Sequence, residues 1–221
     1  MSITPSHYQL TVTALQWLSA DTFELRFDRP EGFSYEPGQK IGFRHQDVYR
    51  DYTLLGPPQA PELAICARRL DQGRFTPLLA AARPGDRFEV SAPSGYFTFQ
   101  SASRPAVFIA SGTGITPFVA FTRAGVRGFE LLHGARAAAE LYYSRELAPA
   151  ARRYVPCLSA EPSARTYPLT FHGHVTQYLA QALPAGIYDF YLCGPGDMIR
   201  EAIQIIDARF DGSRVFSELF Y

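Results

Sequence analysis

The stretch VFIASGTGITPF, residues 107–118, joins an apolar run to a helix-like pattern through two closely spaced glycines. Gly112 and Gly114 carry no Cβ, so the backbone there can approach a ligand closely. The N–H groups at the start of a helix favour a phosphate, and Pro117 suits a first helical turn. The stretch therefore predicts a turn that binds a nucleotide pyrophosphate. A plain tight turn is the alternative, because the sequence is not the G-x-G-x-x-G fingerprint.

The elements that would position such a site fall into two halves. In the first hundred residues, the segment 22–27 alternates apolar and polar side chains, as a half-buried strand does. One helix is predicted near 77–82. Short strands between frequent turns predict a small antiparallel barrel. The turn clusters are at 28–32, 36–38, 56–58 and 84–85.

After residue 101 the pattern changes to strand–helix alternation, which is typical of a parallel sheet wrapped by helices. Ligands of such sheets bind beyond the carboxyl ends of the strands, which is where the glycine turn falls. A polar segment before Pro105 predicts a boundary between domains 1–100 and 101–221. Strands are predicted over 106–110, 129–133, 154–158, 190–193 and 215–219, and helices over 116–124, 138–147, 175–183 and 198–209.

Composition narrows the function classes. The formal net charge is zero, so nothing favours a nucleic-acid or acidic-membrane partner. The chain has no apolar run that would span a bilayer, and MSITPSHYQL lacks the regions of a signal peptide, so we expect a cytoplasmic protein. The three cysteines are far apart and predict neither a disulfide framework nor a metal or iron–sulfur site. His172 and His174 share a loop and are predicted to be surface residues. No feature indicates an obligate oligomer, so a monomer is expected.

Further motifs accompany the glycine turn along the chain. They are Glu36-Pro-Gly-Gln39, Arg50-Asp-Tyr-Thr53, Gly73-Arg-Phe-Thr76, Pro93-Ser-Gly95, Cys193-Gly-Pro-Gly-Asp-Met198 and Ser217-Glu-Leu-Phe-Tyr221. Each is weak alone, but in this order and spacing they resemble the ferredoxin–NADP reductase superfamily over essentially the whole chain. The resemblance implies a two-domain fold. A six-stranded antiparallel β-barrel that binds flavin over 1–100 precedes an α/β domain with a five-stranded parallel sheet that binds pyridine nucleotide over 101–221.

The resemblance implies that the flavin is FAD. Tyr52 offers a ring for stacking on the isoalloxazine, the Thr53 hydroxyl reaches flavin N5, and the Arg50 fork binds a flavin phosphate. A core tyrosine and a surface arginine are the plain alternatives. The other flavin face is covered by Phe220, favoured by spacing, or by Tyr221, favoured by its terminal position. The implied cofactor contacts are Arg50, Asp51, Tyr52, Thr53, Cys66, Ala67, Arg68, Gly73, Arg74, Phe75, Thr76, Thr116, Phe220 and Tyr221.

The co-substrate implied by the resemblance is NADH or NADPH. The implied nucleotide contacts are Gly112, Thr113, Gly114, Arg136, Ser159, Cys193, Gly194, Pro195 and Met198. A buried free cysteine is usually just a small apolar side chain, and only the Gly-Pro-x-x-Met context gives Cys193 a role beside the nicotinamide. Many NADP-specific relatives carry arginine where this chain has Ala160. A neighbouring carboxylate disfavours a second phosphate, so the sequence favours NADH, although Arg136 and Arg165 could compensate.

The activity implied is that of an FAD-dependent NAD(P)H oxidoreductase with Thr53, Cys193 and Glu218 as catalytic residues. Glu218 would be a proton relay or an orienting group. Electrons would pass to a separate acceptor, such as a ferredoxin, a flavodoxin-type carrier or an oxygenase component. Arg68, Arg69 and Arg74 either dock an acidic carrier or form a solvated charged loop. A regulatory module that binds flavin without turnover, and a reductase of a small molecule, are the alternatives.

Overall fold

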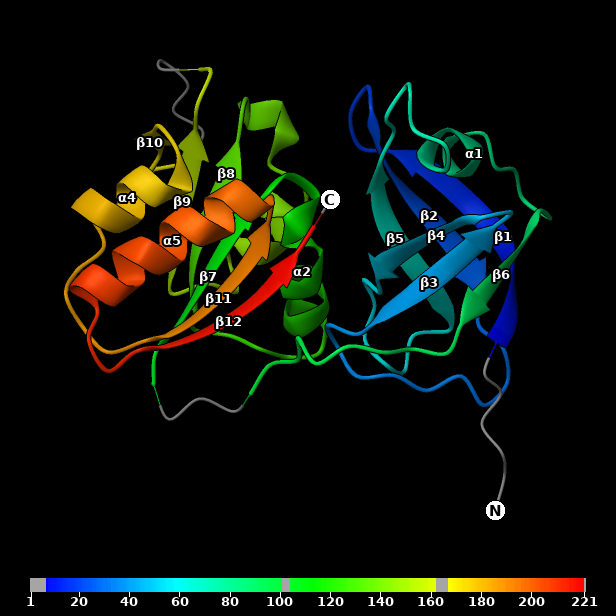
Figure 1. The fold of residues 1–221 in the computed structure, drawn as a ribbon, viewed down its shortest axis with the longest axis horizontal. Helices are drawn as coiled ribbons and strands as arrows, with labels where there is room; N and C mark the ends of the chain where they lie inside the picture. The colour runs from blue at the N-terminus through cyan, green and yellow to red at the C-terminus, as the bar shows by residue number, and fades with distance from the viewer. Residues whose placement is uncertain (1–6, 101–103, 162–166, 221) are drawn as a thin grey trace. The chain divides into compact units, whose positions relative to one another are not determined.

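The computed structural model describes residues 7–100, 104–161 and 167–220, and it divides the chain into two compact units. Unit 1 is Met1–Phe99 and unit 2 is Gln100–Tyr221. Figure 1 draws both units, which differ in secondary structure: unit 1 is built mainly of strands, whereas unit 2 alternates strands and helices.

Unit 1 is one six-stranded antiparallel sheet with the strand order β4-β3-β6-β1-β2-β5. The sheet curls until its two edge strands approach each other, where Leu54 and Ile65 form an isolated bridge. The predicted six-stranded antiparallel fold is therefore confirmed. The sheet is curled, and one isolated bridge joins its two edges. The strands are β1 His7–Trp17, β2 Thr22–Asp28, β3 Lys40–His45, β4 Val48–Thr53, β5 Glu62–Arg68 and β6 Arg87–Ser91.

Aromatic side chains fill the interior of unit 1. Phe43 lies near its centre, with ring centroids 5.7 Å from Phe27, 5.5 Å from Tyr52 and 6.0 Å from Phe75. The one helix of this unit in the described residues, α1 Thr76–Ala80, is slightly earlier than predicted. The helix ends at Ala80, a few residues before Pro84. This proline disfavours a helical conformation at Arg83, the residue before it. The cofactor motifs of β4 and α1 are thus anchored to one apolar core.

Unit 2 is a six-stranded parallel sheet with the order β10-β9-β8-β7-β11-β12. All five predicted strands are present, and the two-residue strand β10 is added, which is too short to produce a hydrophobic period. The chain proceeds outward from β7 to β10 and then returns to β11, so the topological switch point lies between β7 and β11. The strands are β7 Ala106–Ser111, β8 Glu130–Ala135, β9 Arg153–Leu158, β10 Phe171–His172, β11 Asp189–Gly194 and β12 Arg214–Leu219.

Three of the four predicted helices of unit 2 are confirmed: α2 Thr116–Arg123, α4 Val175–Gln181 and α5 Gly196–Arg209. The continuous helix predicted over 138–147 is wrong. That segment forms the 3₁₀ turn η2 Ala138–Glu140 and the single turn α3 Ser144–Leu147. Tyr143 interrupts it in the left-handed region with φ of 57°, a conformation that no helix continues through.

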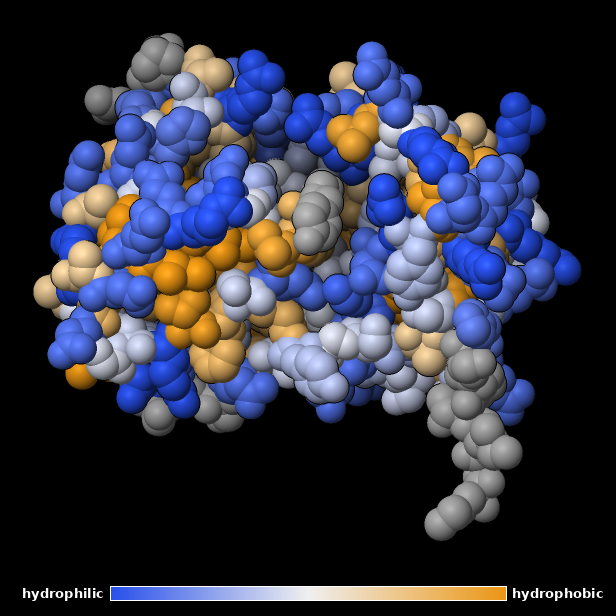
Figure 2. Space-filling view, viewed as in Figure 1, coloured by the Kyte–Doolittle hydropathy of each residue, from blue (hydrophilic) through white to orange (hydrophobic). Residues whose placement is uncertain are grey.

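Helices α4 and α5 cover one face of this sheet (Figure 1), where they bury Val107, Ile109 and Leu132. On the other face, Phe108 stacks on Phe118 of α2 with centroids 4.6 Å apart. Hydrophobic surface is visible along α5 in Figure 2, in keeping with the partial burial of its Ile203 and Ile205. No helix in the described part of the chain is both long and apolar enough to cross a bilayer.

Candidate active site

The glycine turn of unit 2 lies at the switch point and packs against the end of β11. A Cβ on Gly114 would lie 2.3 Å from the Cys193 carbonyl oxygen and 2.9 Å from Gly194 Cα. Only glycine allows this approach, because no Cβ contact is that short. Gly112 has φ of 57° and open space around it. The turn therefore leaves bare backbone at the carboxyl edge of the sheet, as a site for a phosphate requires.

The ends of β11 and β12 complete this edge. Cys193, which is fully buried, is paired in register with Ala110 on β7 and with Glu218 on β12. One residue further, the Phe220 N–H donates to the Gly194 carbonyl at 3.0 Å. The structure thus brings Gly114, Cys193, Gly194, Glu218 and Phe220 together, although they come from three separate motifs. Tyr221 lies outside the described residues.

Thr116 and Met198, two further residues of these motifs, pack against the turns at this edge of the sheet. The Thr116 hydroxyl donates to the Thr113 carbonyl at 2.5 Å, and its side chain is fully buried. This hydroxyl therefore holds the turn η1 Gly112–Ile115 to α2. Met198 lies against Gly194, whose added Cβ would come within 2.6 Å of the Met198 methyl. Both residues shape the turns rather than offer free polar atoms.

Arg136 and Ser159 follow β8 and β9 on the other side of the switch point. Backbone bonds continue beyond the strands here, from Ser159 N–H to Ala135 O at 3.1 Å and from Ala160 N–H to Arg136 O at 2.9 Å. The segments that follow β8 and β9 are therefore hydrogen-bonded to each other at this edge of the sheet.

In unit 1, strand β4 divides its motif between two faces. Arg50 is paired with Phe43 and Tyr52 with Ile41, so both side chains lie on the face of the aromatic core. The exposed Arg50 donates to the Tyr49 carbonyl at 2.7 Å and keeps further donors for a phosphate. Tyr52 packs on Phe75 at 6.2 Å between centroids. Burial raises the pKa of Tyr52 far above its ordinary value, so this ring stays neutral.

Thr53 ends the same strand with a buried hydroxyl. The residue is 2% exposed, and its Oγ1 has no hydrogen-bond partner among the described residues. A buried polar atom without a partner costs about 1–3 kcal/mol, so a ligand atom that bonded it would be favoured. This orphaned hydroxyl, which follows Tyr52 in the chain at the end of β4, fits a bond to a ligand atom. Asp51 pairs with Lys40 at 3.0 Å, on the face of β4 opposite to Arg50 and Tyr52.

The Gly73–Thr76 segment forms a compact loop. Gly73 N–H donates to Leu70 O at 2.8 Å, and Leu70 N–H donates to the Thr76 hydroxyl at 2.9 Å. Phe75 is buried in the core, and Arg74 pairs with Asp47 at 2.5 Å. This ion pair lowers the pKa of Asp47. The Thr76 hydroxyl keeps its own proton for donation to a ligand.

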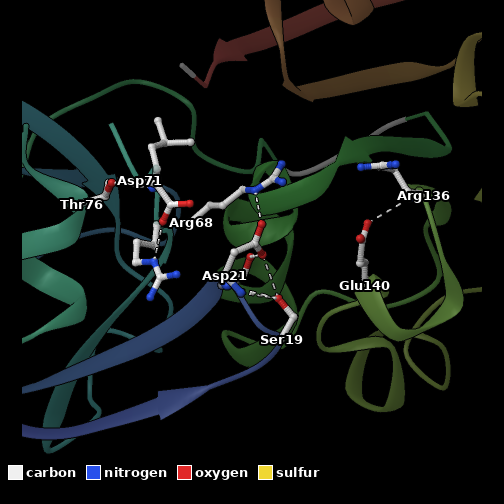
Figure 3. A network of polar contacts seen from close by, with 10 residues as sticks. Ser19, Asp21, Arg68, Asp71, Thr76, Arg136 and Glu140 are labelled. Carbon is white, nitrogen blue, oxygen red and sulfur yellow. Dashed lines mark hydrogen bonds and ion pairs between the residues drawn. The ribbon is translucent and has the colours of Figure 1, made fainter. Parts of the chain in front are cut away.

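The remaining implied residues of this unit lie on β5. Cys66 and Ala67 are buried, and Arg68 pairs with Asp21 at 2.7 Å. Figure 3 shows the Asp21 carboxylate held between Arg68 and Ser19. The candidate docking arginines are thus all paired with aspartates, because Arg69 also bonds Asp71, at 3.2 Å. They contribute little net charge for the attraction of an acidic carrier.

Two groups near these sites were not indicated by any motif. Asp47 meets Arg74 across 27 positions of sequence, and only the β3–β4 hairpin brings them together. His133 is fully buried on β8, with Nδ1 2.9 Å from the Tyr154 hydroxyl. His172 and His174 are exposed as predicted, and the His174 side chain caps α4. In the described residues, no group of histidine, cysteine and carboxylate side chains could hold a metal.

Residues 108–204 match the model of the oxidoreductase NAD-binding domain. The chain is 28% identical over 218 residues to the toluate 1,2-dioxygenase electron transfer component of Pseudomonas putida, an alignment that covers 91% of this chain and 64% of that protein. It is 26% identical to the reductase component of propane 2-monooxygenase from Rhodococcus jostii, which it covers to 59%. The chain thus spans roughly three-fifths of the length of the curated relatives it matches.

Solved structures share the fold of both units. The Amycolatopsis cytochrome P450 reductase GcoB superposes with a TM-score of 0.81 at 27% identity, over 99% of this chain and 72% of that one. A ferredoxin–NADP reductase from Neisseria gonorrhoeae, determined with bound FAD and NADP, gives a TM-score of 0.81 over 99% of this chain and all of that one. Its identity is 17%, so that likeness is one of fold alone.

Proposed function

We propose that this chain, which has the two-unit fold of the ferredoxin–NADP reductase superfamily and contains its NAD-binding domain, is a flavin-dependent oxidoreductase. It passes electrons between NAD(P)H and a separate acceptor. Unit 1 binds FAD and unit 2 binds the pyridine nucleotide. The observation that carries the proposal is the buried Thr53 hydroxyl, without a partner among the described residues, at the end of the strand that carries Arg50 and Tyr52.

The residues of unit 1 bind and orient the flavin. Tyr52 provides a neutral aromatic face, and the Thr53 hydroxyl provides one directed hydrogen bond to flavin N5. Arg50 and the Gly73–Thr76 loop provide donors for the diphosphate, as planar guanidinium groups and loop N–H groups do. The aromatic packing of Tyr52 on Phe43 and Phe75 fixes the ring before any ligand arrives. Pre-organisation of this kind lowers the entropic cost of binding.

The residues of unit 2 bind the nucleotide. The turn at Gly112–Gly114 presents backbone N–H groups to its diphosphate, and Cys193 closes the edge beside it with a small apolar side chain. Glu218, paired in register with Cys193, holds or orients a proton at its carboxylate. When bound, the flavin supplies the hydride and electron chemistry, so the protein needs only to position and shield the reactants.

We propose a ferredoxin, a flavodoxin-type carrier or an oxygenase component as the acceptor. Its support is that the toluate dioxygenase and propane monooxygenase relatives are electron transfer and reductase components of oxygenases. The three cysteines are free and buried, which suits the reducing cytoplasm. A small-molecule reductase is the second candidate, because the same two sites would serve it.

Anaerobic mixing tests the proposal directly. The purified protein is expected to bind FAD and to be yellow, and NADH or NADPH is expected to bleach the flavin absorbance within seconds. Stopped-flow absorbance at the flavin band measures this, and addition of a ferredoxin or a ferricyanide oxidant should restore the colour. Protein that takes up FAD but is not bleached by either nucleotide would instead indicate a binding module without turnover.

A further inference from the structure

The chain passes from unit 1 to unit 2 between Phe99 and Gln100, and a tyrosine of the parallel sheet holds the backbone at that point. The Tyr191 hydroxyl accepts a hydrogen bond from the Gln100 N–H at 3.1 Å and donates one to the Gln100 carbonyl at 3.4 Å. The two residues are 91 positions apart in the sequence. One hydroxyl therefore bonds both polar backbone groups of the first residue of unit 2.

Aromatic packing fixes the position of this hydroxyl. Tyr191 lies in the middle of β11 and is fully buried. Its ring stacks on Phe216 with centroids 4.7 Å apart, and it meets Phe108 and Phe121 edge to face at 5.5 and 6.2 Å. A ring packed against three others keeps its hydroxyl in one place. A buried tyrosine hydroxyl needs a hydrogen-bond partner, and here that partner is the connection between the units.

The same strand holds the connection at a second point. The Asp189 N–H, at the start of β11, donates to the Pro105 carbonyl at 3.0 Å. Gln100 and Pro105 are therefore both hydrogen-bonded to β11, the first through the side chain of Tyr191 and the second through the backbone of Asp189.

Strand β11 also carries one end of the proposed nucleotide site. Side chains alternate along a strand, so Tyr191 and Cys193 lie on the same face of β11, about 7 Å apart along the strand. Cys193 is the residue proposed to lie beside the nicotinamide. The proposed hydride transfer joins a flavin bound to unit 1 and a nicotinamide bound to unit 2. Its rate therefore depends on how firmly the connection holds the two reactants in position.

We infer that Tyr191 is a positioning residue for this transfer, because its hydroxyl holds the connection between the units to the strand that ends at Cys193. The inference rests on the proposed function. Tyr191 acts through Gln100 rather than through contact with either reactant. FAD binding needs unit 1 and nucleotide binding needs unit 2, so neither depends on this hydroxyl. Only the step that needs both units depends on it.

Tyr191→Phe tests the inference, because it removes the hydroxyl and keeps the ring that packs in the core. The FAD-loaded full chain is mixed anaerobically with increasing concentrations of NADH or NADPH, whichever bleaches the flavin faster. Stopped-flow absorbance then gives the dissociation constant of the nucleotide and the limiting rate of flavin reduction. We expect the limiting rate to fall about three- to tenfold, the range that one net hydrogen bond supports, with an unchanged dissociation constant and FAD content. Hydrogen–deuterium exchange should be faster at the Gln100 amide.

Tyr188→Phe is the matched control. The Tyr188 hydroxyl also bonds the backbone of unit 2, at the Pro184 carbonyl and 3.1 Å, but it does not bond Gln100. Its removal should lower the urea midpoint of unfolding about as much as Tyr191→Phe does. The limiting rate of flavin reduction and the exchange at Gln100 should both stay at the wild-type values.

An unchanged limiting rate in Tyr191→Phe, or unchanged exchange at Gln100, would overturn the inference and leave the proposed function standing. An equal fall in the control, or a fall that accompanies lost FAD or weaker nucleotide binding, would also overturn it, since each indicates general structural damage. A wild type whose flavin is reduced by neither nucleotide would refute the proposed function, and the inference with it.

Discussion

Unit 1 and unit 2 build their sites from different parts of the chain. In unit 1 the candidate flavin contacts are side chains, the Arg50 guanidinium, the Tyr52 ring and the Thr53 hydroxyl, mounted on one strand over a pre-packed aromatic core. In unit 2 the candidate nucleotide contacts are mainly backbone groups, at Gly112, Gly114 and Gly194. A side-chain site is damaged by removing atoms, whereas a backbone site is damaged by adding them. The two units should therefore respond to opposite kinds of substitution.

Gly114→Ala should have the largest effect, because it adds an atom where the backbones of two strands meet. The new Cβ would lie 2.3 Å from the Cys193 carbonyl, so the turn after β7 must move away from β11. We expect the rate of flavin reduction by NADH to fall at least 100-fold, as displacement of a positioned reactant by about 1 Å can cause. Flavin content should stay normal, because FAD binds to unit 1.

Gly112→Ala is the matched control for that substitution. Gly112, unlike Gly114, has a positive φ, of 57°, and its Cβ would meet nothing within 4 Å. It therefore suffers only the strain of the left-handed region, about 1–2 kcal/mol. Stopped-flow reduction rates should rank wild type, Gly112→Ala and Gly114→Ala in that order. Equal rates for the two alanine variants would show that close approach to Cys193 is irrelevant.

Acid should separate the units by a smaller but distinct effect, through His133 in unit 2. Complete burial lowers the pKa of His133 to about 3, below the 6.5 of an unfolded chain. The folded unit therefore binds fewer protons than the unfolded one. The stabilisation from neutral His133 is complete above pH 6.5 and is lost as the pH falls toward 3, by up to about 1.4 kcal/mol per pH unit. In unit 1, His7 is exposed and His45 partly exposed.

Urea unfolding at several pH values measures this difference with two signals. Trp17, the one tryptophan of the chain, reports on unit 1, and far-ultraviolet circular dichroism reports mainly on the helices of unit 2. Between pH 7 and 5 the helical signal should lose stability faster than the tryptophan signal. His133→Gln should flatten the slope of the helical signal, whereas His172→Gln, at an exposed position, should not. Parallel slopes in all three proteins would contradict a buried neutral His133.

The same contrast explains how far the sequence alone could lead. Periodicity and turn residues predicted both sheets. The family resemblance implied that Gly114, Cys193 and Glu218 belong to one site, and they meet because strand ends of one parallel sheet share an edge. The helix over 138–147 could not be corrected from the sequence, since the left-handed Tyr143 is imposed by tertiary context. The pairing of Arg68, Arg69 and Arg74 with aspartates could not be foreseen either. The cross-strand Arg68–Asp21 and Arg74–Asp47 pairs depend on register and hairpin geometry rather than on local pattern.

Thr53→Val should give the smallest change in stability among these variants. It tests whether the Thr53 hydroxyl of unit 1 contacts the flavin. Valine replaces the unpartnered hydroxyl by a methyl group of similar size, so the flavin-free protein should gain about 1 kcal/mol in unfolding free energy. The FAD-loaded protein should be reduced roughly tenfold more slowly by NADH, because a hydrogen bond to flavin N5 is lost.

Thr122→Val is the control, since the Thr122 hydroxyl on α2 is likewise buried without a partner in the described residues. It should stabilise unit 2 similarly and leave flavin reduction unchanged. If both variants are stabilised and both keep the wild-type reduction rate, the Thr53 hydroxyl does not contact the flavin, and the site must be sought elsewhere in unit 1.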